Sequence, residues 1–219
     1  MIILKSKFIK RWRGKDGKYR YLYRQPSGRK KESEQRLAPN GKPSNLSEFQ
    51  YKQVRTPEFK KWFGDWENDP DTASKVIDEN GEPLVLYRHD KSEIKVFDPD
   101  KTGKGGEQFG SGFYFTDKKE YASLYGENLN QYFLSIKNPI TWDRADSKTV
   151  KKAQRIAKPW GVVIGYTVNK PELFTAKLKE NKYDGIVVAL RDKVGTKEII
   201  SFESTQIKSA SQNKGIQSR

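Results

Sequence analysis

One short stretch of the sequence gathers side chains that could carry chemistry. The apolar run LVLYRHD (residues 84–90) ends in Arg88, in His89, which is the chain's one histidine, and in Asp90. A histidine beside a carboxylate is a pairing used in acid–base and nucleophilic catalysis and in metal sites. A catalytic triad, a metal site, and a buried strand that stops in a charged loop are the three interpretations of this cluster.

The rest of the sequence gives little support to the first two interpretations. With one histidine and no cysteine, a zinc site is not expected. A Ser-His-Asp triad stays open, but no GxSxG nucleophile elbow accompanies the histidine. The glycine-rich stretch GKGGEQFG (103–110) lacks the GK[ST] sequence that opens a helix in a phosphate-binding loop.

The cluster lies in a region where strands and helices are both predicted. SKVIDENGEPLVLYR (74–88) predicts two strands around an Asn80-Gly81 turn. GFYFT (112–116) predicts an aromatic strand, and the next residues, 117–126, predict a helix capped by Asp117. Because strands and helices do not alternate regularly, we expect an α+β fold rather than a doubly wound one. Further strands are predicted over residues 93–98, 130–143, 183–190 and 197–203, and further helices from Pro57 and over residues 147–158 and 171–182.

The first quarter of the chain is set apart by its charge. The 219 residues carry a net charge of +15, and residues 1–60 hold 17 Lys or Arg against 5 Asp or Glu. Aromatic and basic residues alternate over residues 8–24 around Asp16-Gly17, which predicts a basic β-hairpin. This asymmetry favours an anionic partner such as nucleic acid, with a solubilising arm as the alternative.

Composition also predicts the domain organisation. Residues 25–50 are rich in Pro, Gly, Ser and charge, which is typical of a linker. We therefore expect a hairpin and linker over residues 1–50, a main domain over residues 51–212 and a loose tail over residues 213–219. No apolar run approaches the roughly 18 residues of a membrane span, and the start lacks the features of a signal peptide. A cytoplasmic protein with no membrane contact is expected.

Three segments resemble, in the same order, the motif strands of the ADP-ribosyltransferase fold. They are ENGEPLVLYRHD (79–90), GFYFTDKKEYASLYG (112–126) and KEIISFESTQIKSA (197–210). The similarity is to the group of such domains in phage and mobile-element polyvalent proteins, and it covers about residues 50–212. It implies a split β-sheet core with flanking helices, as in the PARP and diphtheria-toxin folds, and the basic hairpin lies outside it.

The resemblance also implies an NAD site. Glu198 matches the carboxylate that stabilises the oxocarbenium-like transition state when the bond between nicotinamide and ribose breaks. Tyr114 and Tyr125 match the two positions whose rings clamp the nicotinamide. Arg88 takes the place of the usual histidine, and His89 takes the place of the usual glycine. The catalytic residues expected from the resemblance are Glu198, Arg88 and Tyr114, the NAD contacts are Arg88, His89, Tyr114, Thr116 and Tyr125, and no metal is expected.

Two departures from the family pattern bear on the substrate. An arginine at position 88 is typical of the Arg-Ser-Glu class of these enzymes, but the second motif here is of the tyrosine type. Enzymes that modify arginine carry Glu or Gln two residues before the catalytic Glu, where this chain has Thr196, so an arginine target is disfavoured. The glycine-rich loop 101–110 either covers the NAD phosphates with Lys101 or Lys104 or is a plain surface loop.

The function expected from the resemblance is that of an NAD-dependent mono-ADP-ribosyltransferase. It would be a phage effector that modifies a host protein or nucleic acid. One alternative is a catalytically decayed module that binds DNA or RNA through residues 1–50. Another is an NAD glycohydrolase, in which water is the acceptor.

Overall fold

The chain divides into two compact units, Met1–Arg36 and Leu37–Arg219. The division falls ahead of the boundary predicted at residue 50, because residues 37–50 already contribute buried side chains to the second unit. The computed structural model describes residues 7–24, 35–90, 97–98, 102, 107–123 and 128–211.

Several predictions from the sequence fall on other residues. Tyr125, Lys101 and Lys104 lie outside the described residues, as do the predicted tail and most of the strand predicted over residues 93–98. The helix predicted over residues 117–126 is described as far as Ser123.

The first unit contains an antiparallel pair of strands, β1 (Lys7–Arg13) and β2 (Tyr19–Arg24). The turn between them forms around Asp16 and Gly17. The backbone N–H of Gly14 donates to the carbonyl of Lys18 over 2.8 Å, and the carboxylate of Asp16 accepts from the backbone N–H of Lys18. Gly17 has a φ of +75°, which explains why glycine stands there.

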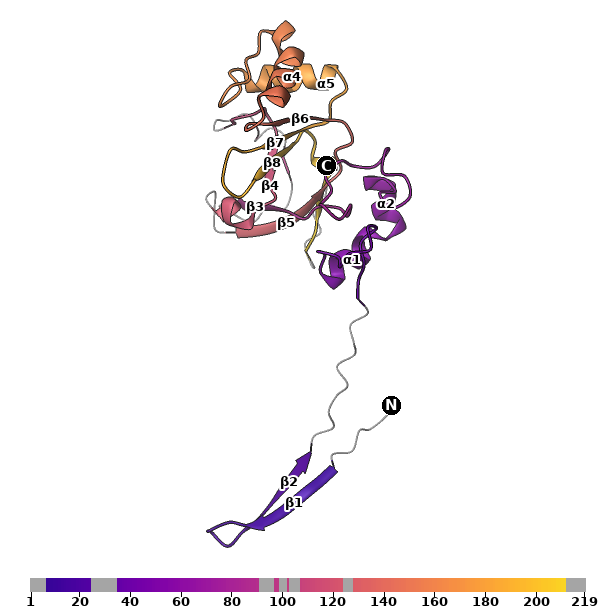
Figure 1. Cartoon of the computed structure of the whole chain (residues 1–219), viewed down its shortest axis with the longest axis vertical. Coiled ribbons are helices and arrows are strands. Elements are labelled where there is room, and N and C mark those ends of the chain that lie inside the picture. The colour runs from indigo at the N-terminus through magenta and orange to yellow at the C-terminus, as the bar shows by residue number, and fades with distance from the viewer. Residues whose placement is uncertain are drawn as a thin grey trace. The chain divides into compact units, whose positions relative to one another are not determined.

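The second unit is built around a seven-stranded mixed sheet within the described residues (Figure 1). Its order is β6–β7–β8–β4–β3–β5–β9; β6 and β7 run parallel, and the other neighbours run antiparallel. The strands are β3 (Leu86–Asp90), β4 (Phe113–Thr116), β5 (Asn128–Leu134), β6 (Pro139–Asp143), β7 (Gly185–Ala189), β8 (Lys197–Ser201) and β9 (Ile207–Ser209).

Helices pack at both ends of this sheet. In Figure 1, α4 (Ser147–Ala157) and α5 (Pro171–Glu180) lie beyond β6, and α1 (Glu48–Val54) and α2 (Pro57–Phe63) lie beside β5. A short helix, α3 (Lys119–Ala122), follows β4. Short 3₁₀ segments follow α4 and β8, over Lys158–Trp160 and Ser204–Gln206. The α+β class is therefore confirmed. None of the helices in the described ranges is long and apolar enough to cross a membrane.

Helix α1 was not predicted, because the composition around it is typical of a linker. Its N-terminus is nevertheless defined by a capping box, in which Ser47 accepts from the backbone N–H of Gln50 and the Gln50 side chain accepts from the backbone N–H of Ser47. Helix α2 begins as predicted, with Thr56 as the N-cap and Pro57 at the first position.

The two faces of the sheet pack against different clusters. Alternate residues of a strand point to opposite faces, so Ile200 packs with α4 and α5 while Ile199 packs with the aromatic core around Phe115. Residues that pair directly across neighbouring strands share a face. The pairs Tyr87–Thr116 and Thr116–Glu198 therefore place these three residues on one face, the face that carries Ile200.

Candidate active site

Four strands bring polar side chains to one edge of the sheet. Arg144 follows the end of β6, and Arg191 follows β7 closely. Because β6 and β7 are parallel, their carboxyl ends meet at the same edge. The antiparallel strand β8 begins at this edge with Glu198 as its second residue, and β4 ends there with Thr116.

Glu198 is a buried carboxylate in the middle of this arrangement. It lies on β8, the strand between β4 and β7, where it pairs with Thr116 and Val188, and it is 6% exposed. Burial raises the pKa of Glu198, because a carboxylate loses hydration there. The hydroxyl of Tyr121 donates a hydrogen bond to it, and the charge of Arg144 attracts it, and both lower the pKa in partial compensation. Tyr121 and Arg144 therefore both favour the charged form of a carboxylate that burial disfavours.

Tyr121 comes from α3 (Lys119–Ala122), the short helix after β4. Asp117 was predicted to cap this helix, but the N-cap is Lys118, which makes no side-chain cap bond. Asp117 instead accepts a hydrogen bond of 2.8 Å from the backbone N–H of Lys197. This bond ties the end of β4 to the residue before Glu198, so it helps to fix both the tyrosine and the carboxylate.

The turn before β8 is fixed in the same way. The carboxylate of Asp192 accepts a hydrogen bond of 3.0 Å from the backbone N–H of Thr196. The backbone N–H of Leu190 donates to the carbonyl of Thr196 over 2.7 Å, and Thr196 is 1% exposed. The segment from β7 to Glu198 is therefore a closed turn that holds Arg191 and Asp192 at the sheet edge.

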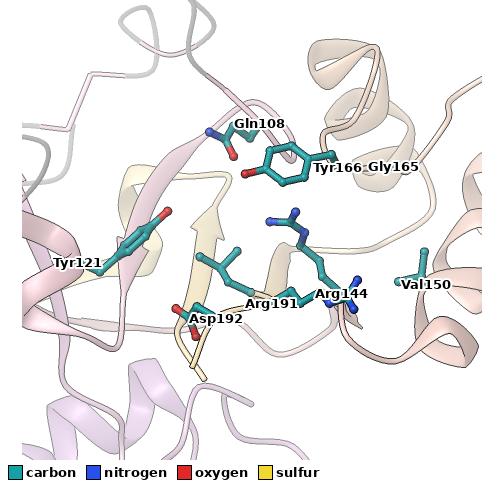
Figure 2. A pocket seen from close by; sticks show the side chains of 9 residues that line it. Gln108, Tyr121, Arg144, Val150, Gly165, Tyr166, Arg191 and Asp192 are labelled. Carbon is teal, nitrogen blue, oxygen red and sulfur yellow. The ribbon is translucent and has the colours of Figure 1, made fainter. Parts of the chain in front are cut away.

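A pocket of about 590 Å³ opens at this edge. Figure 2 shows Tyr121 on one side of the space, and Tyr166 with Arg144 facing it from the other side. The Arg144 guanidinium lies 4.1 Å from the centroid of the Tyr166 ring, and Tyr166 is 74% exposed. The volume is within the range of about 300–1,000 Å³ typical of ligand pockets. The lining residues are Gln108, Tyr121, Arg144, Val150, Gly165, Tyr166, Leu190, Arg191 and Asp192.

Tyr114 lies on the Glu198 face, but its hydroxyl is used by the protein itself. The hydroxyl accepts from the backbone N–H groups of Phe109 and Gly110, at 3.1 and 3.2 Å, and donates to the carbonyl of Gly110 at 2.6 Å. Burial raises its pKa strongly. The hydroxyl of Tyr114 therefore fixes the loop before β4, and the nicotinamide-clamping role expected for its ring stays a prediction.

Arg88 is not brought to Glu198. It follows Tyr87 on β3, and Tyr87 shares the Glu198 face, so Arg88 points to the opposite face. Its guanidinium lies 5.8 and 5.9 Å from the ring centroids of Phe115 and Phe97, and it donates to the carbonyl of Tyr114 over 3.0 Å. Arg88 therefore links β3 to β4 among aromatic rings, on the face opposite Glu198.

Two further predicted NAD contacts, His89 and Thr116, lie on described strands. By the same alternation, His89 lies on the Glu198 face. Thr116 is 4% exposed and accepts from the backbone N–H of Lys118, so it fixes the turn into α3 beside Glu198. In the described ranges, no group of three or more His, Asp or Glu side chains is placed to hold a metal ion.

Four residues that we place in the site were missed by the sequence analysis: Tyr121, Arg144, Tyr166 and Arg191. Tyr121 lies in the same motif segment as Tyr125 and four residues before it, a spacing that puts two side chains on one face of the helix predicted there. Arg144 and Arg191 directly follow the strands predicted over residues 130–143 and 183–190, and ligands often bind beyond the carboxyl ends of strands. Tyr166 lies in a loop with no motif, and no sequence signal marks it.

The site combines three kinds of group. The buried carboxylate can stabilise positive charge, the two guanidinium groups can bind an anion, and the exposed ring can stack on a flat ligand. The arrangement therefore suits a ligand with negatively charged groups and an aromatic ring, at which positive charge develops during a reaction.

Comparison with known proteins gives one match. The family model described as ADP-ribosyltransferase in polyvalent proteins matches residues 78–217, which include β3, β4, α3, β8 and every residue of the pocket. No curated protein and no solved structure matches the chain.

Proposed function

The chain belongs to the family of ADP-ribosyltransferase domains of polyvalent proteins, and from that premise we propose that it is an NAD-dependent mono-ADP-ribosyltransferase with Glu198 as its catalytic carboxylate. The observation that carries this proposal is the network at the sheet edge, in which Tyr121 and Arg144 both act on the buried Glu198 carboxylate. A carboxylate held in this way at the family's motif position supports a working site.

The chemistry of the pocket fits NAD as the donor. Arg144 and Arg191 supply positive charge for the pyrophosphate, and the exposed Tyr166 ring offers a surface for a base. Tyr121 faces the same space and can contact the nicotinamide side of the molecule through its ring (Figure 2). We assign these residues to NAD in place of Arg88 and of the clamping ring predicted at Tyr114. His89 and Thr116 stay in the assignment, because they lie on the same face of the sheet as Glu198.

NAD supplies the bond that breaks, between the nicotinamide nitrogen and the anomeric carbon of the ribose. As this bond lengthens, positive charge grows on the ribose, and the Glu198 carboxylate stabilises that charge or holds a ribose hydroxyl. Nicotinamide leaves as a neutral molecule. The acceptor then forms a bond to the anomeric carbon and loses a proton.

The acceptor is proposed to be a macromolecule of a host cell, because the sequence resembles domains of phage and mobile-element proteins. Hydrolysis of NAD by water is the competing activity, since the bond-breaking groups are the same in both. A decayed site is disfavoured because the groups around Glu198 form a complete network rather than an unsupported carboxylate.

The test is to incubate the purified chain with NAD labelled in the adenylate part, with and without a cell lysate. We expect release of nicotinamide and transfer of label to a macromolecule. Glu198→Gln keeps the shape of the side chain and should reduce nicotinamide release by about 100- to 1,000-fold, the usual effect of removing one stabilising group. Glu172→Gln is the matched control, because Glu172 is exposed in the first turn of α5.

Two results would count against the proposal. If the wild-type chain releases no nicotinamide under conditions where it is folded, the transferase assignment is wrong. If Glu198→Gln and Glu172→Gln keep equal activity, Glu198 is not the catalytic carboxylate. Nicotinamide release without labelled macromolecule would assign the glycohydrolase activity instead.

A further inference from the structure

The first compact unit carries a charged surface that the proposed transfer does not use. Strands β1 and β2 with their connecting turn form the basic ribbon, residues 7–24, which holds eight Lys or Arg and one Asp. Over residues 8–21, every residue except Gly14 is exposed. The ribbon therefore presents a dense positive charge to the solvent.

The one acidic residue of the ribbon is engaged in the turn. Asp16 accepts from the backbone N–H of Lys18 and from the Arg20 guanidinium, the latter over 3.3 Å. It therefore offsets the charge of a single arginine. The cations at positions 10, 11, 13 and 15 are exposed, and Arg13 donates to an uncharged group, the carbonyl of Gly17, so their charges can meet an anionic partner.

Large aromatic side chains lie among these cations and are also exposed. Phe8, Trp12, Tyr19 and Tyr21 are 53%, 43%, 54% and 52% exposed. A ribbon of two strands has no second layer in which to bury such rings, and it is marginally stable by itself. Exposed apolar groups of this extent mark interaction surfaces.

The register places rings and cations together on both faces of the ribbon. Arg11 pairs with Tyr21 and Arg13 pairs with Tyr19 on one face, and Trp12 pairs with Arg20 on the other. The Arg11 guanidinium lies 4.6 Å from the Tyr19 ring centroid, and the Lys10 ammonium lies 5.8 Å from the Trp12 ring centroid.

We propose that the basic ribbon binds single-stranded nucleic acid. Single strands expose both of the groups that this surface matches, because their phosphates can contact Lys and Arg while their unpaired bases stack on the aromatic rings. A duplex offers the phosphates but keeps its bases stacked on one another. The inference rests on the ribbon alone and is independent of ADP-ribosyl transfer at Glu198.

The experiment measures the binding of the full chain to a labelled oligonucleotide of about 20 nucleotides, as single-stranded DNA, single-stranded RNA and duplex DNA. We expect single strands to bind more tightly than the duplex, and affinity to fall with salt by about 0.7 in log–log slope for each phosphate contacted. The DNA and RNA arms identify which polynucleotide is preferred.

Variants separate the charges from the rings. Arg11→Ala and Arg13→Ala should each reduce the salt slope by about 0.7. Trp12→Ala and Tyr19→Ala should each weaken binding about ten-fold with little change in slope, while Trp12→Phe and Tyr19→Phe should retain most of the affinity because a ring remains.

The matched control is Lys151→Ala with Lys152→Ala, which removes two exposed cations from α4 in the other unit. The proposal is overturned if this pair lowers the slope as much as the ribbon variants do. It is also overturned if duplex binds as tightly as single strands, if loss of the rings has no effect, or if vesicles rich in phosphatidylserine compete better than single strands. Binding should be unchanged in Glu198→Gln, so failure of the transferase assignment leaves this test intact.

Discussion

The sheet-edge site and the basic ribbon both place an arginine over a tyrosine ring, but the two pairs lie in different surroundings. At the sheet edge, Arg144 lies 4.1 Å from the Tyr166 ring beside a buried carboxylate. In the ribbon, Arg11 lies 4.6 Å from the Tyr19 ring on an open two-stranded surface. The first pair lines a concave pocket that suits one small ligand, whereas the second repeats along a strand and suits an extended polymer.

The two regions also differ in how their charges respond to the solution. Glu198 is buried, so its state depends on desolvation and on specific neighbours, and pH is the variable that tests it. The ribbon cations are exposed, so salt screens them and is the variable that tests them. A buried group with specific neighbours suits chemistry at a defined atom. A row of exposed charges suits attraction to a long polyanion.

The largest expected effect is on the free energy of unfolding, and it comes from buried hydrogen bonds near the site, whose groups cannot bond to water instead. Tyr114→Phe removes a hydroxyl that bonds Phe109 and Gly110, and leaves their backbone groups without these partners. We expect a loss of about 3 kcal/mol in the free energy of unfolding, measured by chemical denaturation. Tyr166→Phe, at an exposed ring, is the control and should change stability by less than about 0.5 kcal/mol. Equal stability of the two variants would contradict a structural role for the Tyr114 hydroxyl.

The next effect concerns the pocket arginine. Arg144→Ala should raise the KM for NAD by about 10- to 100-fold, the range expected for loss of a charged hydrogen-bonding group from a ligand site. Arg155→Ala on the exposed side of α4 is the charge-matched control and should leave KM unchanged. Steady-state kinetics of nicotinamide release measure both. An unchanged KM in Arg144→Ala would show that the pocket does not hold the donor.

A smaller effect is expected in the pH profile. The Tyr121 hydroxyl stabilises the charged form of Glu198 and so lowers its pKa, and its removal in Tyr121→Phe should raise that pKa further. Because the carboxylate is the active form, the acid limb of the rate–pH profile should move to higher pH, with about a 3- to 10-fold loss of rate at pH values on that limb. A profile that loses rate without shifting would mean that Tyr121 acts on the substrate rather than through Glu198.

The fold and the motif strands were predictable because they depend on local pattern. The aromatic strand at β4, the strand ending near His89 and the late strand carrying Glu198 all appear in the structure, and the family match supports the domain. Helix α1 was missed because Pro, Gly and Ser around it indicated a linker, although its capping box of Ser47 and Gln50 was present in the sequence.

The side chains that meet in the site were harder to predict, because strand register decides them. A change of one position moves a side chain to the other face of a sheet. Arg88 illustrates this point, since motif alignment gave it the place of a cleft histidine while the pairing of Tyr87 with Thr116 turns it to the opposite face. The interactions of Tyr121 and Arg144 with Glu198 join segments far apart in the chain, so local signals that mark the two residues do not show that both act on one carboxylate.

The smallest expected effect is on the melting temperature, and it is tested by replacing one carboxylate in each region, Glu198 at the sheet edge and Asp16 in the ribbon. The pKa of Glu198 is raised in the folded state, so the folded protein binds this proton more tightly than the unfolded chain does. The stability that the protonated form contributes is present below the unfolded pKa of about 4.3 and is lost as pH rises through the folded pKa. At neutral pH, Glu198→Gln should therefore raise the melting temperature, and the difference should vanish on acidification. Asp16→Asn in the ribbon turn removes an exposed carboxylate, and by thermal denaturation it should change the melting temperature little at either pH. If the melting temperature of Glu198→Gln falls at neutral pH, Tyr121 and Arg144 together outweigh the desolvation of the carboxylate. The expected contrast between the buried charge of Glu198 and the exposed charge of Asp16 would then be wrong.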